Sequence, residues 1–120
     1  MSFGEYFRAL RKSKNVTQKA IADEICKSTM LVSGVETNKN KPFSVSDLEK
    51  IAKFLELTER EYKELLKEAA KERGVLPPYM LRYLNDHDEA YQLLDMFVED
   101  DMGSNLLKKV IEFTEGLKNV

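Results

Sequence analysis

Apolar residues recur at helical spacing along almost the whole chain, and this periodicity limits the fold more than any other feature. Phe3, Tyr6, Phe7 and Leu10 follow the i, i+3, i+4, i+7 pattern, which places them on one face of a helix. The same spacing recurs along the chain as far as residues 104–118, where Leu106, Val110, Phe113 and Leu117 follow it. No stretch alternates apolar and polar residues as a half-buried strand does. The sequence therefore predicts an all-α fold of about eight helices.

Capping residues divide the chain into separate helices. A Ser or Thr can cap a helix alone, or with a Glu three positions later as a capping box. We expect such helix starts at Ser2, Thr17, Ser28, Ser46 and Thr58. Gly74 suits a left-handed helix end, and Asp86 and Ser104 are expected to cap two later helices. We therefore expect a helical domain at residues 1–74 and a helical extension at residues 75–120.

The residue inventory excludes several classes of site. One Cys excludes an intrachain disulfide, and one His excludes Cys/His zinc clusters and a two-His metal site. The acidic residues around His87 are interpreted as a solvated loop, so we expect neither metal nor cofactor. No phosphate-binding loop or Ser-His-Asp pattern is present, and an enzyme is not expected. No apolar run approaches the roughly 18 residues that span a bilayer, which favours a cytoplasmic protein.

The charges are unevenly divided along the chain, although the net charge is only -2. Residues 1–58 hold 10 basic and 7 acidic side chains, whereas residues 59–120 hold 9 basic and 14 acidic ones. Residues 8–41 alone hold 8 basic and 3 acidic side chains. This asymmetry suggests one face for a polyanion and another for a different partner, with chance scatter as the alternative.

The segment from residue 17 to residue 42 has the layout of a DNA-binding motif. Two short helices are expected at residues 17–25 and 28–37, and the turn between them is too short for an antiparallel arrangement. The two helices must then cross at a steep angle, as in a helix-turn-helix. In that motif the second helix enters the major groove and the first crosses the phosphate backbone.

The residues of this segment carry a more specific resemblance. The matching positions are Thr17, Gln18, Ala22, Ile25, Ser28, Val32, Ser33, Val35, Glu36, Lys39 and Pro42. This pattern resembles the XRE-type (Cro/cI phage-repressor-like) helix-turn-helix family, and residues 48–55 are similar to that family's fourth helix. The resemblance covers roughly residues 3–69. It implies a lambda-repressor-like five-helix domain that binds double-stranded DNA.

Three residues depart from the family pattern. Cys26 and Asn38 stand where the family usually has turn glycines, and Lys27 replaces an apolar residue. Asn tolerates a positive φ, so the change at Asn38 is mild. Gly34 lies inside the second helix of the motif, where it costs roughly 1 kcal/mol of helix propensity relative to Ala. This glycine is either a tolerated weakness or a place of close approach.

The resemblance also implies roles for individual residues. Gln18 would bind a phosphate, a second group would face the bases, and a third would brace the DNA backbone. The implied DNA-binding residues are Thr17, Gln18, Lys27, Ser28, Thr29, Met30, Ser33, Gly34, Thr37, Lys39, Asn40 and Lys41. The base-reading group (Thr29, Met30, Ser33 and Gly34) lacks the Arg, Asn or Gln that read bases through two hydrogen bonds. Specificity would then be modest or rest on DNA shape, unless this face binds a protein.

The sequence thus leads to two functional hypotheses. The first is a sequence-specific DNA-binding transcriptional regulator, expected to be a repressor that acts as a homodimer on a palindromic operator. The second is a protein-binding module, antitoxin-like or antirepressor-like, whose C-terminal helices bind a partner protein. In both, the apolar faces of the extension form the dimer or partner interface. Its expected residues are Leu94, Leu106, Val110, Phe113 and Leu117.

Overall fold

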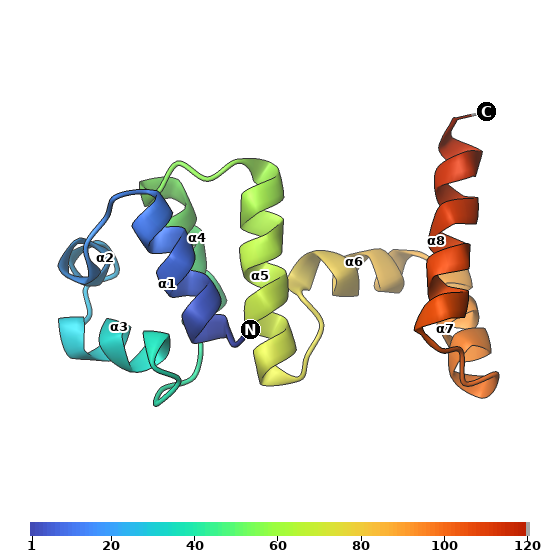
Figure 1. Cartoon of the computed structure of the whole chain (residues 1–120), viewed down its shortest axis with the longest axis horizontal. Helices are drawn as coiled ribbons and strands as arrows, with labels where there is room; N and C mark the ends of the chain where they lie inside the picture. The colour runs from blue at the N-terminus through green and yellow to red at the C-terminus, as the bar shows by residue number, and fades with distance from the viewer. Residues whose placement is uncertain (120) are drawn as a thin grey trace. The chain divides into compact units, whose positions relative to one another are not determined.

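The computed structural model describes residues 1–119, and within them the chain is all-helical (Figure 1). The eight helices are α1 (Phe3–Ser13), α2 (Gln18–Glu24), α3 (Thr29–Glu36), α4 (Val45–Phe54), α5 (Glu59–Arg73), α6 (Pro78–Asp86), α7 (Asp88–Glu99) and α8 (Ser104–Lys118). They form two compact units, Met1–Met80 and Leu81–Val120. The predicted all-α class is confirmed. No helix of the described part is long and apolar enough to cross a bilayer.

Several helices begin where the capping residues predict. The Thr17 hydroxyl accepts a hydrogen bond from the Ala20 N–H at 3.1 Å and so caps α2. Thr58 and Glu61 form the full capping box of α5, with reciprocal bonds of 3.1 and 2.9 Å. Ser28 caps α3 in the same way as Thr17 caps α2. These side chains satisfy backbone donors that a helix start otherwise leaves without a partner.

Three predicted helix starts are wrong. Ser44, not Ser46, caps α4, because its hydroxyl accepts from the Asp47 N–H at 3.1 Å. The third helical position holds Asp47 rather than the Glu of a capping box, and Asp47 supplies the same negative charge in the first turn. Asp86 is the last residue of α6, and the N-cap residue of α7 is His87, which makes no side-chain capping bond. The N-cap residue of α8 is Gly103, so Ser104 is already the first helical residue.

The core of the first unit is built from one apolar face of each of α1 to α5. Phe43, from the segment between α3 and α4, packs edge-on against Phe7 with the ring centroids 4.9 Å apart. Phe7, Ile21 and Leu65 are completely buried. Burial of such side chains contributes about 1.5–3 kcal/mol each to folding. This core fixes α3 against α1, and α2 against α3 and α4, so the motif sits on a packed scaffold.

The start of α1 lies against the end of α3. The Gly4 N–H donates to Asn38 Oδ1 at 3.2 Å, and Asn38 Nδ2 donates to the Ser2 hydroxyl at 2.9 Å. A Cβ atom at Gly4 would lie 2.5 Å from the carbonyl oxygens of Val35 and Glu36. Asn38 has a φ of 63°, the left-handed conformation that the sequence predicted it could tolerate. Gly4 and Asn38 therefore hold the C-terminal end of α3 on α1.

The helix end predicted at Gly74 is confirmed, since this residue is the left-handed cap of α5 with a φ of 72°. Tyr79, which lies beyond the predicted boundary after Gly74, packs against the core of the first unit. The division of the chain into residues 1–74 and 75–120 stays a prediction.

The second unit buries very little of its apolar surface. Neither α7 nor α8 contains a buried side chain, although both carry apolar residues at helical spacing. Their large exposed apolar residues are Tyr91, Leu93, Leu94, Met96, Val98, Leu106, Ile111, Phe113 and Leu117. An exposed apolar surface of this extent is typical of a site that another molecule covers.

Candidate nucleic-acid interface

The turn between α2 and α3 gives the helix-turn-helix its geometry. Ile25 ends α2, Cys26 takes a left-handed φ of 57°, and the Lys27 N–H donates to the Ala22 carbonyl at 3.0 Å. The chain thus turns sharply within three residues. Figure 1 shows α2 viewed along its axis while α3 lies across the view, so the two helices cross steeply. Cys26 keeps the conformation that a glycine at this turn would adopt, although it carries a Cβ atom.

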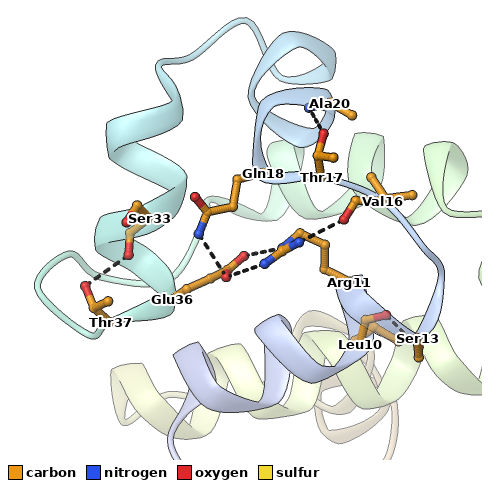
Figure 2. Close-up of polar contacts among 10 residues, drawn as sticks. All are labelled: Leu10, Arg11, Ser13, Val16, Thr17, Gln18, Ala20, Ser33, Glu36 and Thr37. Carbon is orange, nitrogen blue, oxygen red and sulfur yellow. Dashed lines mark hydrogen bonds and ion pairs between the residues drawn. The ribbon is translucent and has the colours of Figure 1, made fainter.

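A buried ion pair fastens α3 to α1 (Figure 2). The Arg11 Nε atom lies 2.7 Å from Glu36 Oε2, and Arg11 Nη2 donates to Glu36 Oε1 at 3.0 Å. Arg11 Nη1 also donates to the Val16 carbonyl at 2.8 Å, directly before α2. Both charged side chains are buried. One guanidinium thereby connects α1, α3 and the segment that leads into α2.

Gln18 joins this network through its side-chain amide. Its Nε2 atom donates to Glu36 Oε1 at 3.2 Å, as Figure 2 shows. An amide nitrogen has two donors, so one remains for a phosphate at the surface. The predicted phosphate role of Gln18 stays a prediction, and the bond to Glu36 adds that its side chain is held in place.

The sequence contains a signal for the ion pair that is separate from the helix-turn-helix pattern. Arg11 follows Phe7 by four residues, so it lies on the core-facing side of α1. Glu36 directly follows the buried Val35 at the end of α3. A charged residue on the apolar face of a helix needs a partner of opposite charge, because an unpaired buried charge is costly.

The first turn of α3 presents its side chains to solvent. Thr29 is exposed, and the Met30 side chain is 82% exposed, an unusual position for a large apolar residue. Ser33 is half-buried one turn later. Two other hydroxyls predicted to bind DNA make hydrogen bonds to the backbone of α3. Ser28 accepts from the Leu31 N–H, and Thr37 donates to the Ser33 carbonyl at 3.0 Å.

Gly34 is buried, although it follows the exposed Met30 by four residues and so lies on the same side of α3. The Asn40 side chain covers it: a Cβ atom at Gly34 would lie only 2.2 Å from Asn40 Nδ2 and 2.8 Å from Asn40 Cγ. The Gly34 carbonyl accepts the backbone N–H groups of Lys39 and Asn40 at 2.9 and 3.0 Å. Asn40 Nδ2 also donates to the Leu31 carbonyl at 3.4 Å. The structure therefore explains Gly34 as a place of close approach.

Three lysines of the motif segment present their charge to solvent, whereas Lys19 pairs with Asp23 at 3.0 Å. Lys27, Lys39 and Lys41 are exposed, and none of them forms an ion pair within residues 1–119. The lysines of α5, by contrast, each pair with a nearby glutamate. Lys39 and Lys41 line a hollow of about 520 Å³ beside Arg73, whose guanidinium donates to the Phe43 carbonyl at 2.8 Å. This bond ties the lysine-bearing loop to α5.

The predicted interface residues of the extension lie on α7 and α8. Leu94, Leu106, Phe113 and Leu117 are between 45% and 70% exposed, and Val110 is partly buried. Leu94 and Val110 line a mainly apolar groove of about 650 Å³ within the second unit. Among the described residues, including the segment around His87, no group of three or more His, Cys, Asp or Glu side chains is placed to hold a metal ion.

Comparison with known proteins agrees with the motif. The family model described as helix-turn-helix matches residues 7–62, which run from the middle of α1 into α5. No curated protein and no solved structure gives a significant match to the chain.

Proposed function

Residues 7–62 belong to the XRE-type helix-turn-helix family, and from this premise we propose that the protein is a sequence-specific transcriptional regulator. It acts as a repressor, in the form of a homodimer on a palindromic operator. α3 enters the major groove, and α2 crosses the phosphate backbone. The other residues predicted to contact DNA belong to the start of α2, as Thr17 and Gln18 do, or to the segments on either side of α3.

The observation that carries the proposal is the exposed start of α3 among unpaired lysines. Met30 is 82% exposed, and an apolar side chain placed there can contact a thymine methyl group. Lys27, Lys39 and Lys41 flank α3 in the chain, and none of them forms an ion pair with a carboxylate of residues 1–119. Lysines of this kind bind phosphates and release counterions from DNA. The Arg11–Glu36 pair supports this arrangement, because it holds α3 rigidly on α1.

The occupant that we propose for the exposed faces of α7 and α8 is a second copy of the chain. A two-fold operator offers two identical half-sites, and two identical apolar faces can pair by the same symmetry. Linking the two DNA-binding units in this way raises their joint affinity without new DNA contacts. Leu106 and Phe113 on α8 are central to this interface, and Leu94 extends it onto α7.

The charge of the second unit fits a role away from DNA. Residues 81–119 contain 9 acidic and 4 basic side chains, so this unit carries the whole negative excess of the chain. Residues 1–80 carry a net charge of +3. Phosphates within about 10 Å would repel the acidic unit at ordinary ionic strength.

The test of DNA binding is the affinity of the full chain for duplex DNA as salt concentration rises. The double variant Lys39→Ala/Lys41→Ala should bind all sequences more weakly, and its salt slope should fall by about one for each lost phosphate contact. The matched control is Lys50→Ala/Lys53→Ala, which removes two exposed lysines from α4. An unchanged slope in the first variant would refute the phosphate contacts.

The test of the homodimer is the molar mass in solution, measured by light scattering. Phe113→Glu should convert a dimer to a monomer, since a charge replaces a 70% exposed ring in the proposed interface. The control Asn105→Glu places the same charge at an exposed polar position of α8 and should leave the dimer intact. A monomeric parent chain would refute the homodimer.

A second candidate function is an antitoxin-like or antirepressor-like module. The exposed apolar residues of α7 and α8 favour it, because a different protein could cover the same face. A monomeric chain that binds no duplex DNA would favour this candidate over the regulator.

A further inference from the structure

We infer that Asn40 is a base-reading residue and that it supplies the hydrogen-bonding group that α3 itself lacks. The inference rests on the proposed function, because it assumes that the exposed side of α3 faces the major groove. Asn40 belongs to the loop after α3, where the family resemblance assigned it only to the DNA backbone. The contacts of its side chain with Leu31 and Gly34 place it instead against the surface of α3.

The position of the Asn40 amide follows from its contact with Gly34. Gly34 comes four residues after Met30, so a side chain at Gly34 would stand beside Met30 on the same stripe of α3. The space that this side chain would fill is taken by the Asn40 carboxamide, whose Nδ2 atom lies 2.2 Å from the Cβ position. Asn40 therefore adds a polar group to the stripe of α3 that contains the 82% exposed Met30.

The backbone holds Asn40 in this place. The Gly34 carbonyl accepts the N–H groups of both Lys39 and Asn40, at 2.9 and 3.0 Å, so the loop folds back onto the helix. Asn40 Nδ2 donates to the Leu31 carbonyl at 3.4 Å, which orients the amide with its nitrogen toward the helix. A side chain that is already positioned loses less conformational entropy when it binds a base.

The remaining hydrogen-bonding groups of Asn40 match adenine. One N–H of the amide binds the Leu31 carbonyl, which leaves one N–H donor and the Oδ1 acceptor. In the major groove adenine offers the N7 acceptor and the N6 donor side by side, and an Asn amide pairs with both. Guanine offers two acceptors, so it can use only the donor half of this pair. Asn40 should therefore select an A·T base pair.

This arrangement explains why α3 contains a glycine at position 34. Any side chain at position 34 would displace the Asn40 amide from the surface of the helix. Gly34→Ala should then remove the same base preference as Asn40→Ala, although residue 34 donates nothing to DNA. The displaced group is the end of an exposed side chain, so Gly34→Ala should melt at a Tm no lower than the parent chain.

The test is selection of bound sequences from random duplex DNA, carried out with the full-length parent chain and its variants. Asn40→Ala should lose the preference for adenine at one position of each half-site by about 10- to 100-fold and keep the others. Gly34→Ala and the double variant Gly34→Ala/Asn40→Ala should lose the same position and no further one. Circular dichroism checks that each variant is folded.

The controls separate this inference from the proposed function. Lys39→Ala, in the same loop, should weaken binding to all sequences and keep the adenine preference. Retention of every base preference by Asn40→Ala, with the parent chain selecting a clear motif, would overturn the role of Asn40 alone. Recovery of no motif by the folded parent chain would overturn the sequence-specific function and the base-reading role together.

Discussion

The Arg11 guanidinium and the Glu36 carboxylate form a buried bidentate ion pair, with contacts of 2.7 and 3.0 Å, that joins α1 to α3. Gln18 donates a further hydrogen bond to the same carboxylate at 3.2 Å. Three helices, α1, α2 and α3, thus meet at one pair of charges. This network fixes the helix-turn-helix more tightly than apolar contacts alone, because it has one satisfactory geometry.

Removal of one partner of this ion pair should destabilise the first unit strongly. Glu36→Ala leaves the Arg11 charge buried without a counterion, which costs about 3–5 kcal/mol in comparable cases. Urea unfolding followed by circular dichroism measures the change in the free energy of unfolding. The paired variant Arg11→Met/Glu36→Leu leaves no buried charge and should be much closer to the parent chain. Equal losses in the two variants would contradict the importance of the unpaired charge.

Gly4→Ala should destabilise the fold by about 1–3 kcal/mol, because the added methyl group cannot fit where α1 meets α3. The Cβ atom would lie 2.5 Å from two backbone carbonyl oxygens, which cannot move without shifting the end of α3. Thermal unfolding of the full chain measures the effect. Gly116→Ala in α8 is the control, since nothing lies within 4 Å of its Cβ position and no loss is expected. A Gly4→Ala protein as stable as the parent chain would show that the two helices can separate freely.

Cys26→Gly should stabilise the first unit by about 1 kcal/mol. Cys26 has a φ of 57°, and a residue with a Cβ atom pays about 1–2 kcal/mol for this conformation. Glycine avoids this cost, at the expense of some additional entropy in the unfolded chain. Cys26→Ala keeps a Cβ atom and should give no such gain. Identical urea midpoints for the Gly and Ala variants would argue against backbone strain at the turn.

The stability of the first unit should fall as pH rises above 10, and Tyr6 should account for part of this fall. Burial, followed by the negative charges of Glu64, Glu68 and Glu61, raises the pKa of Tyr6 from 10.0 to about 12. The folded protein therefore keeps the proton that the unfolded chain releases, so the contribution is complete below pH 10 and lost by about pH 12. Tyr6→Phe should show a shallower decrease of Tm over this window. Parallel profiles for the two proteins would contradict a raised pKa.

Thr29 and Met30 should influence which sequences bind rather than how strongly DNA binds in general. Both lie in the exposed first turn of α3, and neither side chain carries a charge for phosphates. Thr29→Ala or Met30→Ala should change the selected base preferences by roughly 5- to 100-fold and leave the affinity for unrelated duplex DNA nearly unchanged. The same loss on every sequence would exclude base reading by this turn.

The periodicity of apolar residues was sufficient to predict the helices, and short-range capping chemistry placed most of their ends. Thr17, Thr58 and Gly74 act within one helical turn, so their roles can be predicted from the sequence. Ser44 was missed because its partner is Asp47 rather than Glu, a small change in a local rule.

The contacts that shape the candidate interface could not be predicted in the same way, because they depend on tertiary packing. The motif pattern marked the correct segment, but it did not indicate that Glu36 faces Arg11 or that Gln18 also binds Glu36. Asn40 covers Gly34 only because two backbone hydrogen bonds fold the loop onto α3. The pattern predicts which residues of α3 face the bases. Only the packing shows that the Asn40 side chain lies beside them.

The most direct test of the central claim is the ratio of two affinities of the full-length protein, measured at near-physiological salt. The first is for the duplex that the protein selects from random DNA, and the second is for a duplex of the same length and composition in scrambled order. We expect the selected duplex to bind about a thousandfold more tightly or better, as specific regulators do. Equal affinity for the two duplexes would contradict sequence-specific recognition by α3 and its loop.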